Sequence, residues 1–181
     1  MEKQATKSGM KDFISIIIYI AVVLLFSYVI LTYVGQRTVV SGDSMYDTLE
    51  DGDNLIVDKL SYRFHEIERF DVIVFRFQGS NVHYIKRIIG LPGETVKIED
   101  GTIYINGKVL DESYGYEKMI DSGIAKDEIT LGDDEYFVLG DNRNDSKDSR
   151  DPSVGKIPRS YIDGKAFLRI YPFSKFGTID K

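Results

Sequence analysis

The chain has 181 residues, a formal net charge of −6 and 43% apolar residues, a balance that excludes a mainly disordered chain. It contains no cysteine, which excludes a disulfide scaffold, a CxxC redox site and a cysteine-ligated zinc site. The acidic balance provides no general basic face for nucleic acid, so we expect no nucleic-acid partner. The 147 residues that follow residue 34 suffice for one domain with its own core.

Residues 13–34, FISIIIYIAVVLLFSYVILTYV, contain no charged side chain. As a helix that rises about 1.5 Å per residue, this segment would be about 33 Å long, close to the ~30 Å hydrocarbon core of a bilayer. A cleaved signal peptide is the alternative. Its apolar region would be only about 7–15 residues long and would end in small residues of the A-x-A kind, which are absent before Gly35. We therefore predict an uncleaved transmembrane anchor over residues 13–34, with the lipid bilayer as a partner.

The charges that flank this segment predict its orientation. The cations on its N-terminal side are Lys3, Lys7 and Lys11, whereas the next twenty residues contain only Arg37. The positive-inside rule places residues 1–12 in the cytoplasm and residues 35–181 on the outer side of the cell membrane. Because the first twelve residues carry a charge of +1, the remainder carries −7.

Beyond residue 34 the pattern is that of short strands, rich in β-branched and aromatic residues. The expected strands are Leu55–Val57, Val72–Phe77, Tyr84–Ile89, Thr95–Ile98, Ile103–Ile105, Tyr136–Leu139 and Ala166–Ile170. The hairpin signals are Asp51-Gly52, Asp100-Gly101 and Asn106-Gly107, and Leu91-Pro92-Gly93 suits a type II turn. No helical pattern of 10–15 residues separates the strands. We therefore predict a mainly β fold: an antiparallel barrel-like or sandwich-like domain after a single N-terminal helix.

Residues 111–134 are polar and weakly patterned, and they are long for a connection between strands. We predict that they form an inserted loop or a small subdomain within the β-rich domain of residues 35–181.

Three polar segments are candidates for chemistry, and the first is SGDSMYDTL, residues 41–49. It begins shortly after the predicted anchor, and a polar linker that ends in a turn would explain it equally well. It is not a lipase-type elbow, because GxSxG would require glycine where Tyr46 stands.

The second segment is HYIKRIIG, residues 83–90, in which Lys86 and Arg87 would point to opposite faces of a strand. We predict that one of the two points toward the interior. Burial lowers the pKa of a lysine, and a neutral amine can act as a general base for a serine hydroxyl. The alternative is a lysine whose stem lies on apolar surface while its ammonium stays in water. Another alternative is that His83 is the general base, in a histidine-based triad with Ser44 as nucleophile.

The third segment is LGDNRNDSKDSR, residues 139–150, where carboxylates alternate with arginines after a strand. It suits either a solvated loop or an ion-paired layer that supports a site. A calcium loop that starts at Asp141 would need glycine at Ser146 and glutamate at Pro152, so this interpretation fails. We predict no metal and no cofactor.

In this order, the anchor and the segments SGDSMYDTL, YIKRIIGLPGE and LGDNRNDSKDSR resemble the motif boxes of type I signal peptidases, the peptidase S26 family. These are membrane-bound serine endopeptidases that remove signal peptides from exported preproteins. The single span is similar to the Gram-positive bacterial members. The resemblance implies a signal peptidase-like fold, preproteins as partners, and cleavage after small residues of the A-x-A type through an acyl-enzyme.

The resemblance also implies a role for individual residues. Ser44 would be the nucleophile and Lys86 the general base, with Ser146 forming a hydrogen bond with the Lys86 amine that orients it. The backbone at Gly42 and Ser44 would form the oxyanion region, and Met45 would lie near the membrane surface and the substrate groove. The residues implied to make structural ion pairs are Arg87, Asp141, Asp148 and Arg150.

The chain departs from the family pattern at two positions. Family members often have proline where Asp47 stands, which leaves this turn less constrained. Some members have serine where Gly42 stands, with a hydroxyl that completes the oxyanion hole. A third interpretation, from another functional class, also stays open: a non-catalytic anchored domain that binds a partner through an exposed strand edge.

Overall fold

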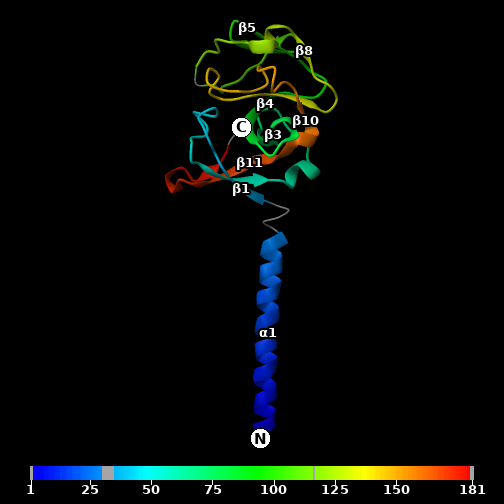
Figure 1. Cartoon of the computed structure of the whole chain (residues 1–181), viewed down its shortest axis with the longest axis vertical. Coiled ribbons are helices and arrows are strands. Elements are labelled where there is room, and N and C mark those ends of the chain that lie inside the picture. Colours follow the sequence, from blue (N-terminus) through cyan, green and yellow to red (C-terminus); the bar gives the residue numbers. More distant parts are fainter. Residues whose placement is uncertain (1, 30–34, 116, 180–181) are drawn as a thin grey trace.

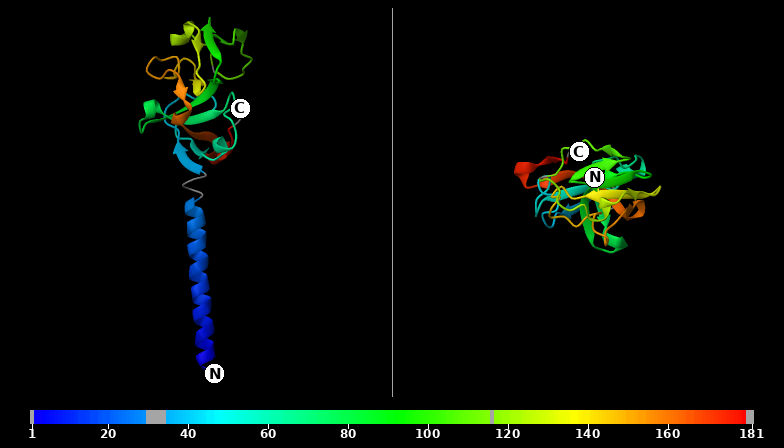
Figure 2. Two further views of the ribbon diagram at one scale, coloured as in Figure 1. Left: turned by 90° about the vertical axis from the view of Figure 1, so that its right-hand side faces the viewer. Right: turned by 90° about the horizontal axis from the view of Figure 1, so that it is seen from above.

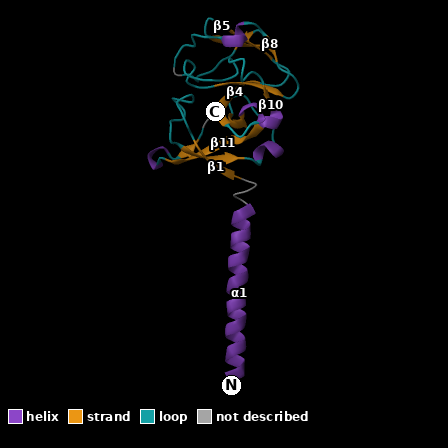
Figure 3. Ribbon diagram, in the orientation of Figure 1, coloured by secondary structure: helices purple, strands orange, loops and turns teal. Residues whose placement is uncertain are grey.

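The structure is a computed structural model that describes residues 2–29, 35–115 and 117–179 (Figure 1). The described residues form one α-helix, twelve strands in two sheets, and short 3₁₀ turns (Figure 3). The helix α1 is Glu2–Val29. The strands are β1 Gly35–Val39, β2 Asn54–Asp58, β3 Val72–Arg76, β4 His83–Gly90, β5 Thr95–Glu99, β6 Thr102–Ile105, β7 Lys108–Val109, β8 Ile129–Thr130, β9 Glu135–Leu139, β10 Ile157–Pro158, β11 Ile162–Tyr171 and β12 Gly177–Thr178.

Helix α1 includes most of the segment predicted as an anchor. It takes part in neither sheet, and its large apolar side chains between Phe13 and Tyr28 are exposed. Within the described ranges, no helix combines the length and the apolar character needed to cross a bilayer. Residues 30–34, the end of the predicted anchor, lie outside the described residues.

The larger sheet has eight strands in the order β1-β2-β11-β3-β4-β9-β10, and β12 also pairs with β11. The smaller sheet has the order β7-β6-β5-β8. All of the described strand pairs are antiparallel, as the sequence predicts. Each of the seven expected runs contributes to a strand, so the mainly β prediction is confirmed.

Two of the predicted hairpins join neighbouring strands of the smaller sheet. Asp100-Gly101 connects β5 to β6 with φ values of 50° and 77°, and Asn106-Gly107 connects β6 to β7 with φ values of 51° and 73°. A two-residue turn with positive φ at both positions matches the right-handed twist of the strands it joins. Asp51-Gly52 differs, because it lies inside the long loop between β1 and β2 and does not join two paired strands directly.

Strands β4 and β9 have apolar side chains on both faces, and each face packs into a different hydrophobic cluster. Ile88 and Val138 belong to the cluster beneath the larger sheet. Ile89, Phe137 and Leu139 belong to a cluster that also contains the side chains of β5 and β6. The two sheets therefore share a core along β4 and β9, which explains why these strands read as nearly continuous apolar runs.

The predicted insertion, residues 111–134, packs against the smaller sheet. It includes a 3₁₀ turn, Gly123–Lys126, and strand β8, which pairs with β5. Its buried side chains Met119, Ala125 and Leu131 lie in the cluster shared by the two sheets. Widely spaced apolar residues in a polar stretch are therefore enough to bring this segment into the core.

Gly90, at the end of β4, lies where the two sheets meet, and it provides a test of this shared core. A β-carbon there would come within 2.7 Å of Val96 Cγ2, 2.8 Å of Leu131 Cδ1 and 3.0 Å of Phe137 Cβ. We expect Gly90→Ala to lower the free energy of unfolding by about 1–3 kcal/mol, the usual cost of overpacking. Denaturant titration of the full chain in detergent measures this change.

Gly177→Ala is the matched control, because a β-carbon at Gly177 would have open space around it. We expect this variant to unfold like the parent chain. Equal effects of the two substitutions would contradict the assignment of the shared core.

Candidate active site

The loop that carries Ser44 connects β1 to β2 and is closed at its base by backbone hydrogen bonds. The Val40 N–H donates to the Asp53 carbonyl (2.8 Å), and the Gly52 N–H donates to the Val40 carbonyl (3.0 Å). Met45 and Leu49 are buried in a hydrophobic cluster with Leu55 and other side chains of the larger sheet. The apolar residues of SGDSMYDTL thus hold the loop on the core, and Ser44 is half-buried at its surface.

Strand β4 provides the other half of the site. Lys86 is 4% exposed and the neighbouring Arg87 is 0% exposed. The sequence predicts that one of these cations is buried, and the structure buries both. The reason is that both faces of β4 are covered, by the Ser44 loop and by the polar segment that follows β9.

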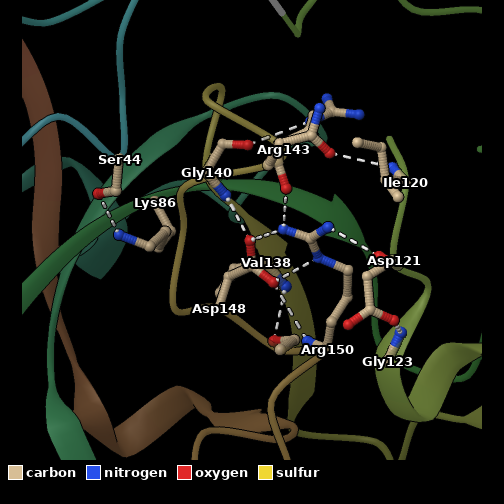
Figure 4. Close-up of polar contacts among 12 residues, drawn as sticks. Ser44, Lys86, Ile120, Asp121, Gly123, Val138, Gly140, Arg143, Asp148 and Arg150 are labelled. Carbon is tan, nitrogen blue, oxygen red and sulfur yellow. Dashed lines mark hydrogen bonds and ion pairs between the residues drawn. The ribbon is translucent and has the colours of Figure 1, made fainter. Parts of the chain in front are cut away.

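Ser44 and Lys86 point toward one another, and Ser44 Oγ lies 2.7 Å from Lys86 Nζ (Figure 4). The Lys86 amine also donates to the Ile85 carbonyl at 2.9 Å, and it lies 5.4 Å from the centroid of the Tyr84 ring. Residues 42 positions apart in sequence therefore place a hydroxyl and an amine in direct contact.

Burial lowers the pKa of the Lys86 amine to about 8, because the ammonium loses its hydration, although the negative charges of Asp148 and Asp141 partly oppose this shift. No carboxylate forms a direct ion pair with Lys86 among the described residues. A substantial fraction of this amine is consequently neutral near physiological pH, the state that a general base requires.

Unlike Lys86, Arg87 has a direct counter-charge, the carboxylate of Asp141. Its guanidinium donates two hydrogen bonds to Asp141, at 2.9 and 2.7 Å, and it also lies 3.7 Å from the centroid of the Tyr114 ring. The Thr48 hydroxyl, from the Ser44 loop, donates to Asp141 at 2.6 Å. This buried pair therefore connects β4, the segment after β9 and the loop that carries the serine.

Asp148 and Arg150 form the second ion pair expected from the sequence. Arg150 donates to both carboxylate oxygens of Asp148 at 2.8 Å, and the Gly140 N–H donates to the same carboxylate at 3.1 Å (Figure 4). The Asn142 N–H donates to the Ser44 carbonyl at 3.1 Å. The segment after β9 is thus an ion-paired layer that contacts the serine loop, rather than a solvated loop.

Ser146 lies beside this layer, but it does not make the hydrogen bond expected of it. Its Oγ is buried and has no hydrogen-bond partner among the described residues, whereas the Lys86 amine contacts Ser44 and the Ile85 carbonyl. The expected contact between Ser146 and Lys86 is therefore absent from this structure, because the amine is directed at those two oxygens.

Gly140 explains how the polar segment approaches the serine loop so closely. A β-carbon at this position would collide with Ser146 Oγ and with the Ser44 carbonyl oxygen. Sequence reasoning missed Gly140 as a site residue, because a glycine at the end of a strand has no signature of its own. It also missed the ion pair of Arg143 with Glu112, which joins the layer to the 111–134 segment at 2.6 Å.

Two further residues named by the resemblance are Met45 and Gly42. Met45 is 1% exposed, so it packs inward and has almost no surface to present to a membrane, although it contributes to the lining of the groove described next. The Gly42 N–H donates to the Asp51 carboxylate at 2.8 Å and is therefore already engaged. No hydrogen bond among the described residues uses the Ser44 N–H as donor, so this amide is available to a ligand.

His83 is the alternative base considered from the sequence. Its Nε2 lies 3.0 Å from Asp163 Oδ2, and its side chain is 39% exposed. The structure gives Ser44 a contact with Lys86 and gives His83 a contact with Asp163. The geometry therefore favours the amine over the imidazole as the partner of the hydroxyl.

A groove of about 380 Å³ opens at the Ser44–Lys86 pair. One wall is formed by residues 38–41 at the end of β1, and the other by residues 82–86 at the start of β4. Among the described strands, β1 pairs only with β2, and β9 pairs with β4 only from Arg87 onward. Both walls therefore present an unpaired strand edge to the groove.

Comparison with known proteins gives the following matches. A family model described as "Signal peptidase, peptidase S26" matches residues 10–171. A probable signal peptidase I-2 of Synechocystis sp. is 40% identical over 155 residues, which cover 82% of this chain and 68% of that protein. A signal peptidase I of Bacillus licheniformis is 35% identical over 181 residues, 96% of this chain and 95% of that protein. A crystal structure of a signal peptidase I from Enterococcus faecalis V583 is 34% identical, with a TM-score of 0.46, and covers 56% of this chain and 97% of that chain.

The buried amine predicts a pH-dependent effect on stability. The folded-state pKa of Lys86 is about 8, below the ordinary lysine value of 10.5, so below pH 8 the fold must bury an ammonium. This cost is fully present below pH 8 and disappears as the pH rises toward 10.5. We expect Lys86→Met to be more stable than the parent chain at pH 7, with an advantage that shrinks by about 2 kcal/mol by pH 9.5.

The measurement is denaturant unfolding of both chains in detergent across this pH range. Lys108→Met is the control, because Lys108 is exposed on β7 and pays no such cost. A difference between Lys86→Met and the parent chain that stays constant with pH would contradict the burial of an ionisable amine.

Proposed function

This chain belongs to the signal peptidase family, peptidase S26, and is a signal peptidase enzyme; from that premise we propose that it cleaves the signal peptides of exported preproteins with Ser44 as nucleophile and Lys86 as general base. The observation that carries the proposal is the 2.7 Å contact between Ser44 Oγ and the buried Lys86 Nζ. The proposed chemistry requires no cofactor or metal.

The proposed reaction begins with neutral Lys86, to which the Ser44 O–H donates its hydrogen bond. As Ser44 Oγ attacks the scissile carbonyl carbon, the proton moves to Nζ and the carbonyl oxygen becomes an oxyanion. The Lys86 ammonium then protonates the leaving amine, the peptide C–N bond breaks, and an acyl-enzyme ester remains. Water hydrolyses the ester in a second cycle with Lys86 again as base.

The oxyanion requires hydrogen-bond donors, which are worth several kcal/mol in acyl transfer. We propose the Ser44 N–H as the donor, because it is unengaged among the described residues whereas the Gly42 N–H is bound to Asp51. A hydroxyl that other members have at the position of Gly42 is absent here, so the remaining stabilisation comes from water or from a donor on the substrate.

An extended substrate fits the groove beside the dyad. A peptide that enters as a strand can pair with the free edges of residues 38–41 and 82–86, and main-chain hydrogen bonds then hold it without regard to side-chain sequence. Val40, Met45 and Ile85 are among the apolar residues of the lining. We propose that these residues form shallow pockets that accept small side chains, as in the A-x-A pattern of exported proteins.

We propose that residues 13–34 anchor the enzyme in the cell membrane, with its N-terminus in the cytoplasm. Support comes from the absence of charge over these residues, from the exposed apolar side chains between Phe13 and Tyr28, and from the lysines that precede them. The ten residues from Val34 to Ser44 span at most about 35 Å when extended. That tether keeps Ser44 close to the bilayer, where the end of a signal peptide emerges.

Substitution of the dyad tests the mechanism. We expect Ser44→Ala and Lys86→Ala each to reduce preprotein cleavage by at least about 10³-fold, because each removes a group that acts in the transition state. The measurement is turnover of a preprotein by the full chain in detergent. His83→Ala is the control and should retain most activity; a loss as large as that of Lys86→Ala would favour a histidine base instead. A penem probe that labels Ser44 covalently would also exclude a non-catalytic binding domain.

The pH profile provides an independent test. Since the pKa of Lys86 is lowered to about 8, the neutral fraction falls about tenfold for each pH unit below that value. We expect kcat/KM to rise with pH along a limb of unit slope that levels off near pH 8. Binding of a non-cleavable substrate peptide, measured over the same range, is the control for general pH effects. A limb with a midpoint near 6.5, the ordinary histidine pKa, would contradict Lys86 as the base.

A further inference from the structure

A second cavity, outside the active site, has three cations among its lining residues. It has a volume of about 270 Å³. We call it the basic pocket, and its lining residues are Lys59, Tyr62, Arg63, Arg159, Ile162 and Asp163. The proposed catalytic mechanism uses none of them.

The pocket has an excess of positive charge in a domain whose overall charge is negative. In the described part of the chain, no ion pair involves Lys59, Arg63 or Arg159. The one carboxylate among the lining residues, Asp163, lies 3.3 Å from Arg76 and 3.0 Å from His83. Three cations therefore line a pocket whose one carboxylate, that of Asp163, already contacts two other basic side chains.

The walls of the pocket are held in place by neighbouring polar contacts. The Arg159 guanidinium donates to the Tyr62 carbonyl at 2.8 Å, and the Tyr62 hydroxyl donates to Asp71 at 2.9 Å. The nearby carboxylate of Asp58 accepts from the backbone N–H groups of Leu60 and Ser61, at 2.8 and 2.9 Å. Asp58 thus holds the backbone that leads into the 3₁₀ turn Ser61–Arg63.

The strand register places this pocket next to the point where the chain leaves the predicted anchor. Gly35, the first described residue after that segment, pairs with Asp58 in β2, and Lys59 follows directly. In two views the teal 3₁₀ turn Ser61–Arg63 lies on the same side of the domain as β1 (Figures 1 and 2). Phe64, the next residue, is 75% exposed. An exposed aromatic ring beside cations is typical of a protein surface at the level of lipid headgroups.

We propose that the basic pocket binds the phosphate of an anionic lipid headgroup at the outer face of the membrane. Arginine guanidinium groups match the oxygen geometry of phosphate, and cations near an anionic membrane surface each contribute to binding. Lipid is favoured over a phosphate ion in solution because the pocket lies beside the strand that pairs with β1, the first described element after the proposed anchor, and this anchor would hold the pocket within reach of the headgroups. The inference rests on the proposed anchor. The bound headgroup would be a second attachment point that limits rotation of the β domain about the anchor.

The absence of cysteine makes a site-specific test direct. Ser160 is exposed next to Arg159, so Ser160→Cys in the full chain can carry a single environment-sensitive fluorophore. The labelled chain is reconstituted into phosphatidylcholine vesicles that contain increasing fractions of phosphatidylglycerol and a trace of lipid with a spin-labelled headgroup. Quenching of the fluorophore then reports how closely the pocket approaches the headgroup layer.

We expect quenching to increase with the phosphatidylglycerol fraction and to saturate. Lys59→Gln and Arg63→Gln should each raise the fraction at half-saturation by about fivefold, since one cation near an anionic surface is worth about 1 kcal/mol. Lys108→Gln, on the smaller sheet, removes the same charge from a surface outside the pocket and should change nothing. Quenching that is independent of phosphatidylglycerol, or equal effects of Lys59→Gln and Lys108→Gln, would overturn the proposal.

Two further arms separate the alternatives. Inorganic phosphate at 1 mM, with ionic strength matched by chloride, should leave the titration unchanged; complete competition would identify a phosphate ion in solution as the ligand and overturn the assignment to lipid. Retention of the chain in vesicles after alkaline carbonate extraction tests the anchor by itself. Its loss would contradict the anchor alone, because the lipid dependence of quenching is scored separately at neutral pH.

Discussion

The catalytic arrangement depends on the burial of one amine without a direct counter-charge. Lys86 is 4% exposed and contacts two neutral oxygens, the Ser44 hydroxyl and the Ile85 carbonyl. Water can no longer stabilise the ammonium, and the carboxylates of Asp148 and Asp141 act on it only from a distance, so its pKa falls to about 8. The free energy that the fold gives up by burying this group is the same quantity that makes the amine available as a base.

The neighbouring cation, Arg87, is also buried, but it has a direct counter-charge. Asp141 binds the Arg87 guanidinium through two hydrogen bonds, and Tyr114 covers its face. Asp141 connects the two buried cations, because it also accepts a hydrogen bond from Thr48 in the serine loop and thereby helps to hold Ser44 against Lys86. A carboxylate in direct contact with Lys86 would raise its pKa and leave less of the amine neutral near pH 7. The ion-paired layer therefore positions the site without placing a counter-charge in contact with Lys86.

Much of this could be predicted from local patterns. The apolar alternation and the Asp-Gly and Asn-Gly pairs were sufficient for the antiparallel strands, and Asp100-Gly101 and Asn106-Gly107 form the expected turns. The residues that form ion pairs in the third segment could be named from the sequence, but the partner of each one could not. Gly140, Glu112 and Tyr114 had no such signal, because their roles consist of contacts with residues distant in sequence. For the same reason the sequence could not predict that Ser146 Oγ has no hydrogen-bond partner among the described residues, because the partner of a hydroxyl is decided by the tertiary structure.

By itself, the sequence determined the uncharged helical segment, the antiparallel β class, and the three polar segments in which the reactive residues lie, since all of these depend on periodicity and on residue type within a short window. Only the tertiary structure decided that both Lys86 and Arg87 are buried, that one keeps a counter-charge and the other does not, and that Asp58 pairs with Gly35 to bring a basic pocket to the start of the domain. The physical reason is that hydration is lost by the joint action of segments far apart in the chain, so neither a pKa nor the direction of a side chain is set by its neighbours in sequence.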